Sequence, residues 1–210
     1  MHKKKYGSLI LFILLFSCLN KGDSKIDIGV KYFNSGHYEK AIQYFEEGLE
    51  LKSAKYKKEL VFTIIGNAYY ELGEFEKSID YHKKSIETNP EFHKSWVNLG
   101  IVYRLTGDFE EAEKCYSKAL EIEPEYAELH ASLGALYIIK EDIDKAIFHL
   151  NKSIEMDSQL AIAHSNLAVA LAYKGQFNEA ENSLRMAVLL GYENGDSIKN
   201  LIDNLKSINE

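Results

Sequence analysis

The chain has 210 residues, of which 46% are hydrophobic and 27% are charged, with only two prolines. This length fits one sizeable domain or one repeat array, and this composition excludes a disordered chain and a multi-span membrane protein. So little proline, together with abundant Ala, Leu, Glu, Lys and Tyr, favours helix over strand. The formal net charge is −7, and three of the 25 basic residues lie at positions 3–5, so the rest of the chain is more acidic still. Nucleic acid is therefore not an expected partner.

The first 17 residues have the pattern of a secretory signal peptide. Residues 1–7, MHKKKYG, are basic, and residues 9–16, LILFILLF, form an unbroken apolar run. That run is about half of what a helix needs to cross the hydrocarbon of a bilayer. A basic start followed by a short apolar segment predicts a cleaved signal over residues 1–17.

The end of this segment resembles a bacterial lipobox, in which an apolar residue and two small residues precede a cysteine. Leu15, Ser17 and Cys18 match that pattern, and Phe16 departs from it by its bulk. The resemblance implies that Cys18 receives a diacylglycerol on its thiol, that cleavage occurs before it, and that acyl chains then anchor the protein in a membrane. Residues 18–25 are expected to form a short tether that overlaps the degenerate start of the repeat array at residues 22–25. An ordinary cleaved signal and an uncleaved anchor are the alternatives.

The body of the chain repeats one motif. Gly66, Gly100 and Gly134 are 34 residues apart, and Ala168 follows after another 34. The third repeat shows most clearly the ten positions that recur, here called the repeat frame: Trp96, Leu99, Gly100, Tyr103, Gly107, Phe109, Ala112, Tyr116, Ala119 and Pro124. This frame resembles that of the tetratricopeptide repeat (TPR) family, and a constant period is the signature of a repeat architecture.

The resemblance implies an all-α fold, a right-handed α-α superhelix of five helix pairs. The predicted repeats are residues 22–55, 59–92, 93–126, 127–160 and 161–194. Each carries two apolar stripes at helical spacing, which one pair cannot bury alone, so the pairs must stack. Residues 196–210 are expected to form a capping helix, whose apolar stripe consists of Ile198, Leu201, Ile202, Leu205 and Ile208.

In TPR proteins the first helix of each pair lines a concave groove, at positions outside the repeat frame. Most of these positions are apolar or aromatic here, which is typical of a partner site. The resemblance implies a groove for a protein or peptide segment, with Asn67, Tyr70 and Arg104 as polar anchors. The predicted groove residues are Phe33, Asn67, Tyr70, Val97, Ile101, Arg104, Ile138 and Tyr173. Alternatively, the array closes this face on itself, on the capping helix, or on a second copy in a homodimer.

One TPR subclass binds the C-terminal carboxylate of a peptide through a clamp of asparagines and cations. Asn67 and Asn98 lie at compatible positions, but Thr63, Glu128 and Ser132 stand where the cations should be. A clamp of this kind is therefore not expected.

No catalytic residue, cofactor or metal site is predicted. The chain has no phosphate-binding glycine loop, no HExxH motif and no nucleophile elbow. His130 and His164 occupy the frame position of Trp96 one and two repeats later, too far apart to share an ion. We therefore interpret both histidines as packing residues.

In architecture the chain resembles small bacterial TPR lipoproteins that help assemble outer-membrane proteins or pili, or that recruit cell-wall hydrolases. The prediction is a membrane-anchored, non-catalytic adaptor of the cell envelope. A surface-exposed ligand-binding lipoprotein and a regulatory subunit of an envelope enzyme complex are the alternatives. Leu19 is not the acidic residue that retains lipoproteins at the inner membrane in some bacteria, which favours the outer membrane.

Overall fold

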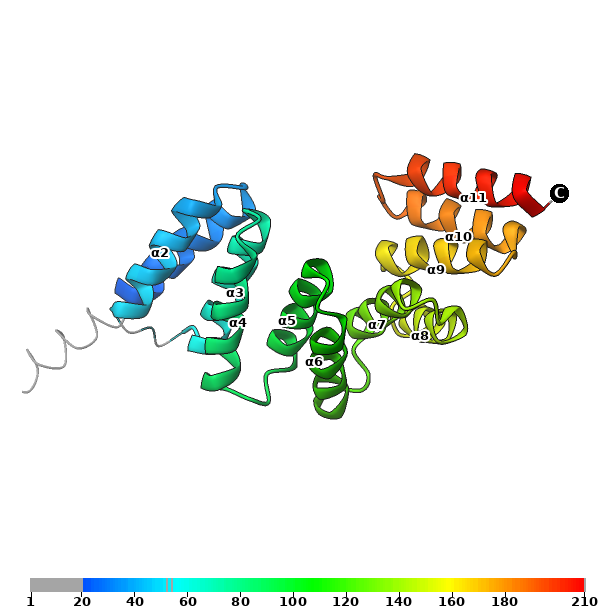
Figure 1. The fold of residues 1–210 in the computed structure, drawn as a ribbon. Helices are drawn as coiled ribbons and strands as arrows, with labels where there is room; N and C mark the ends of the chain where they lie inside the picture. Colours follow the sequence, from blue (N-terminus) through cyan, green and yellow to red (C-terminus); the bar gives the residue numbers. More distant parts are fainter. Residues whose placement is uncertain (1–20, 52, 54, 210) are drawn as a thin grey trace, which may run out of the picture. The chain divides into compact units, whose positions relative to one another are not determined.

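A computed structural model describes residues 21–51, 53 and 55–209 (Figure 1). The chain divides into two compact units between Val102 and Tyr103, which are described separately below. Cys18 and the predicted signal peptide lie outside the described residues. Within the described part, every regular element is a helix, and none is long and apolar enough to cross a bilayer.

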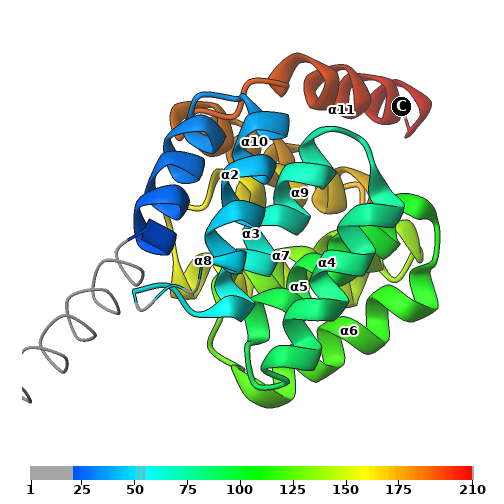
Figure 2. The same ribbon diagram turned by 90° about the vertical axis from the view of Figure 1, so that its left-hand side faces the viewer.

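The helices follow one another as antiparallel pairs joined by short turns (Figures 1 and 2). Residues 21–34 are helical and precede α2 (Tyr38–Glu50), α3 (Lys58–Glu71), α4 (Phe75–Thr88) and α5 (His93–Thr106), inside which the two units divide. The second unit continues with α6 (Phe109–Ile122), α7 (Ala127–Ile139), α8 (Ile143–Met156), α9 (Ala161–Tyr173), α10 (Phe177–Leu189) and α11 (Gly195–Asn209). The predicted all-α fold of five helix pairs and a C-terminal helix is confirmed.

The start of the array differs from the predicted tether. Residues 21–25 are helical, and Ile26, directly after them, is completely buried. Lys25 pairs with Glu47 of α2 at 2.5 Å. These residues are therefore part of the first helix rather than a free linker, because this end of the helix packs on α2, where Gly22 and Ile26 lie next to Gly48.

In the first and fourth pairs, the frame glycine of the first helix lets a large side chain of the second helix lie directly against the backbone. A Cβ added at Gly29 would lie 2.7 Å from the Phe45 ring, and one at Gly134 would lie 2.4 Å from Leu150 Cγ. These distances are below van der Waals contact, so any side chain at these positions would force the two helices apart.

The turn inside each pair needs one residue with a left-handed backbone. Gly36, Gly73, Gly107 and Gly175 supply it, with φ between 73° and 89°. The fourth pair has Glu141 at this position, with φ of 60°. This conformation costs a residue with a Cβ about 1 kcal/mol, whereas glycine adopts it freely.

Replacing Glu141 with glycine is therefore expected to stabilise the α7–α8 pair by up to about 0.5 kcal/mol. The strain of about 1 kcal/mol is relieved, but glycine makes the unfolded chain more flexible, which offsets about half of this gain or more. Hydrogen exchange of the α7 and α8 amides in the full chain measures this gain. Glu155→Gly, in the last turn of α8, is a suitable control, since it should destabilise the same pair by about 0.5 kcal/mol. Unchanged or faster exchange in Glu141→Gly would contradict the expectation.

The C-terminal helix α11 packs on α9 and α10, as Figure 1 shows. Ile198 and Ile202 are buried there, while Leu201 and Leu205 are half-buried. Ile208, predicted to continue this stripe, is 78% exposed, so the prediction is wrong at that residue. It lies in the last turn of α11, beyond the part that contacts the core.

Candidate functional site

The first unit contains a hollow, here called the α3–α5 pocket, of about 260 Å³. Its walls come mainly from first helices of successive pairs, with one residue from α4. It is lined by Phe33, Asn67, Tyr70, Glu71, His82, Asn98, Ile101 and Val102. Four of the eight predicted groove residues are in this set: Phe33, Asn67, Tyr70 and Ile101. Asn67 and Tyr70 are three residues apart and share one face of α3, while Phe33 and Ile101 come from the first helices of the pairs before and after it.

The polar groups of the pocket are few and mostly uncharged. Asn98 Nδ2 donates a hydrogen bond of 2.8 Å to Asn67 Oδ1, which joins α5 to α3. Glu71 lies at the end of α3 with its side chain exposed. Apolar walls with a small number of placed polar groups are typical of a ligand site.

His82 occupies the frame position that Phe45 fills in the first pair and Tyr116 in the third. Its side chain is completely buried, and neither ring nitrogen has a hydrogen-bond partner in the described structure. The ring lies over Gly66, where an added Cβ would be 2.7–2.9 Å from its atoms. Burial lowers the pKa of His82 to about 4, so the ring is neutral at physiological pH.

The frame positions of the second repeat contain a signal for this site. Its second helix has Ser78 where the other repeats have Ala, and His82 where they have an aromatic residue or leucine, and both are fully buried. Ser85 is also fully buried, and the fourth repeat has a serine at the same position, Ser153. Ser85 Oγ shares hydrogen bonds with Thr63 (2.9 Å) and Ser95 (2.6 Å). The Ser78 hydroxyl, like His82, has no partner in the described structure.

Val97, predicted as a groove residue, is 2% exposed and belongs to the packed interior. The equivalent residues of the other repeats, Thr63, Ala131 and Ser165, are also buried. All are small or β-branched, which suits a position where neighbouring helices meet closely. The assignment of Val97 to a surface that a partner touches is therefore wrong.

The remaining predicted groove residues lie in the second unit. Arg104 and Ile138 are half-buried, and Tyr173, at the end of α9, is 52% exposed. The Nε of Arg104 is buried without a described partner. Arg104 lies beside Tyr116, whose pKa is nevertheless raised to about 12 because burial of the hydroxyl outweighs the effect of the cation.

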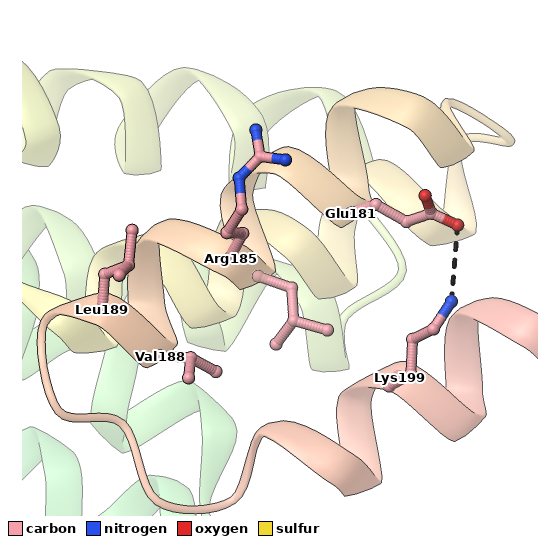
Figure 3. A pocket seen from close by; sticks show the side chains of 6 residues that line it. Glu181, Arg185, Val188, Leu189 and Lys199 are labelled. Carbon is pink, nitrogen blue, oxygen red and sulfur yellow. Dashed lines mark hydrogen bonds and ion pairs between the residues drawn. The ribbon is translucent and has the colours of Figure 1, made fainter.

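The second unit also has a shallow hollow of about 390 Å³ between α10 and α11 (Figure 3). Lys199 of α11 reaches Glu181 of α10 at 3.5 Å, while Val188 and Leu189 lie further along α10. Val188 is 51% and Leu189 is 73% exposed, so this hollow is an open apolar edge rather than an enclosed site.

The histidines that replace the frame tryptophan, His130 and His164, make the same hydrogen bond as Trp96, to a backbone carbonyl six residues earlier. Trp96 Nε1 donates to the Pro90 carbonyl at 2.8 Å, six residues earlier. His130 Nε2 donates to Pro124 O and His164 Nε2 to Ser158 O, both at 3.1 Å and both six residues earlier. Each ring therefore fixes the loop before its own helix. In the described part of the chain, no three His, Cys, Asp or Glu side chains are grouped closely enough to hold a metal ion.

Models of known protein families identify the family of this chain. Two models, both described as tetratricopeptide repeat, match the chain: one at residues 60–92 and 93–126, the other at residues 23–55 and 127–160. Together they account for more than half of the sequence. The chain belongs to the TPR family. A comparison with the sequences of curated proteins found no match.

Solved TPR structures have the same fold. A thermophilic TPR protein of Thermus thermophilus aligns with a TM-score of 0.71 at 19% identity, over 88% of this chain and 98% of its own. PilF of Pseudomonas aeruginosa aligns with a TM-score of 0.74 at 16% identity, over 91% and 86%. MamA of Desulfovibrio magneticus gives 0.63 at 19% identity, over 81% and 94%. At these identities the likeness concerns the fold alone, and the TPR fold serves as a scaffold for protein–protein interaction.

Proposed function

We propose that this TPR protein is a non-catalytic adaptor that holds a segment of a partner protein in the α3–α5 pocket. The observation that carries the proposal is the convergence of Phe33, Asn67, Tyr70 and Ile101 on one hollow of about 260 Å³. That volume accommodates one or two side chains of an extended segment rather than a folded domain. Aromatic residues such as Tyr70 are the usual anchors of such contacts.

The pocket is suited to binding because its elements are fixed before a ligand arrives. Asn67 and Asn98 hold α3 and α5 together, and the Thr63–Ser85–Ser95 hydrogen bonds lie beneath them. A preformed site avoids the entropic cost of ordering its walls on binding. The amide groups of Asn67 and Asn98 retain donor and acceptor capacity toward a peptide backbone.

Replacing Tyr70 with alanine is expected to weaken partner binding about 10-fold or more, because it removes an aromatic wall of the pocket. The measurement is quantitative cross-linking and affinity capture from bacterial envelopes, with the full-length protein as bait. Phe148→Ala is the matched control, since Phe148 is an aromatic residue that is 62% exposed and does not line this pocket. Equal recovery of partners with the Tyr70 variant and the control would refute the pocket as the binding site.

We also propose that Cys18 carries the acyl chains that attach the array to the bacterial envelope. The support is the sequence LFSC after a short apolar run, together with a body that is a single repeat array. Each buried CH₂ of an acyl chain contributes about 0.8 kcal/mol, so two or three chains bind a membrane strongly. Because Leu19 is not acidic, we place the anchored protein at the outer membrane.

Cys18→Ala is expected to abolish fatty-acid labelling of the protein and to release it from the outer-membrane fraction. Metabolic labelling with a tagged fatty acid, followed by membrane fractionation, tests both effects. Cys115→Ala serves as the control, because Cys115 is the only other cysteine and is buried on α6. Label that persists in the Cys18 variant would refute lipidation at this residue.

A further inference from the structure

The α3–α5 pocket carries one negative charge and no positive one. Glu71 is the only acidic residue of the lining, which contains no lysine or arginine, and burial keeps His82 neutral. Within the described part of the chain, no lysine, arginine or histidine pairs with Glu71. Glu71 is therefore the only formal charge among the residues that line the pocket.

Hydrogen-bond acceptors also remain unused in the pocket. Asn67 Oδ1 accepts from Asn98 Nδ2, which leaves Asn98 Oδ1 without a described partner. Neutral His82 has one nitrogen that can only accept, and both its nitrogens are unpartnered although the side chain is fully buried. The His82 nitrogens are not accessible to a ligand, whereas Asn98 is half-buried, so its carbonyl oxygen is the acceptor that a donor group in the pocket can reach.

The walls suit a long side chain with an apolar stem. Phe33, Ile101 and Val102 supply apolar contact, and Tyr70 supplies an aromatic face near Glu71, the next residue on α3. Long basic side chains bury their methylene stems on such surfaces while the cation stays near polar groups and aromatic faces.

From these observations we propose that the pocket binds a lysine or arginine side chain of the partner segment, an inference that rests on the proposed function of this pocket. The stem lies on Phe33 and Ile101, and the cation lies near Glu71 and the Tyr70 ring. An acidic side chain would be repelled by Glu71. A purely apolar one would remove water from Glu71 and Asn98 without replacing their hydrogen bonds.

The test begins with random peptides displayed on phage and selected on the full-length chain in detergent micelles. Peptides that no longer bind Tyr70→Ala define those that occupy the pocket. These peptides are expected to share a lysine or arginine at one position. Synthetic versions of one such peptide, with that residue kept or changed to glutamine or glutamate, then give dissociation constants by fluorescence anisotropy.

Glutamine at the shared position is expected to weaken binding about 10-fold, and glutamate more, through loss of the ion pair and of the contact with the ring. In Glu71→Gln, the lysine-to-glutamine difference is expected to fall to about 3-fold. Glu87→Gln is the matched control, because Glu87 is an exposed glutamate of the same unit that does not line the pocket. The full 10-fold difference should persist in this control.

Failure of this inference can be told apart from failure of the proposed function. Selected peptides that depend on Tyr70 but share no basic residue would refute the proposal that the pocket binds a basic side chain. So would a preference for lysine over glutamine that is undiminished in Glu71→Gln. In both cases the pocket remains a binding site. If no selected peptide depends on Tyr70, the pocket itself is refuted, and the inference falls with it.

Discussion

Acidification from about pH 7.5 to about pH 5 is expected to destabilise the first unit by about 2 kcal/mol through His82 alone. The pKa of this side chain is about 4 in the folded protein and about 6.5 in the unfolded chain. Between these values the unfolded state binds a proton that the folded state does not, so stability is complete above pH 6.5 and falls as the pH decreases toward 4. The ring is fully buried, so solvent does not screen the effect.

His82→Phe is expected to remove this pH dependence and to stabilise the unit by about 1–2 kcal/mol at neutral pH, because it replaces two unpaired polar atoms. Phenylalanine fits the site by precedent in the same protein, since Phe45 lies over Gly29 as His82 lies over Gly66. Trp96, the only tryptophan, belongs to the first unit. Its fluorescence during urea unfolding at the two pH values therefore reports on this unit.

The comparison of wild type and variant separates His82 from the carboxylates, which titrate equally in both proteins. If the unfolding free energy of the wild type changes with pH no more than that of His82→Phe, the expectation is wrong. The His82 ring would then be hydrated and would protonate freely in the folded state.

Gly134→Ala is expected to destabilise the α7–α8 pair by about 2 kcal/mol, although alanine is the better helix former by about 1 kcal/mol. The added Cβ would lie 2.4 Å from Leu150 Cγ, a branched carbon close to the α8 backbone that cannot move aside alone. Leu150 is completely buried, and Leu150→Ala by itself is expected to cost about 3 kcal/mol.

The double variant tests the mechanism. Once Leu150 is alanine, the Cβ at position 134 meets empty space, so the penalty of Gly134→Ala should vanish and the two effects should fall short of additivity by about 2 kcal/mol. Hydrogen exchange of the α7 and α8 amides measures all three variants. An undiminished penalty in the Leu150→Ala background would contradict this packing argument.

The sequence alone predicted much of the fold and four of the eight residues that line the α3–α5 pocket. The 34-residue period places Gly66 and Gly134 on first helices, and it places Gly107 in a turn, where φ is +89°. Carrying the family's groove positions over correctly selected lining residues such as Asn67 and Tyr70. It failed at Val97, because periodicity gives the face of a helix on which a residue lies but not whether a neighbouring helix covers that face.

Local sequence determined the repeat arrangement, because each 34-residue repeat has the same apolar helix faces and the same turn. What only the tertiary structure decided is which buried polar side chains find hydrogen-bond partners. Ser85 finds hydrogen-bond partners in Thr63 and Ser95, whereas His82, one turn earlier on the same helix, finds none. Partners of this kind come from other helices, at positions where each repeat has its own residues. The 34-residue period therefore predicts the position of His82 on its helix. Only the packing of the helices determines that its ring has no hydrogen-bond partner and a low pKa, and which residues line the α3–α5 pocket.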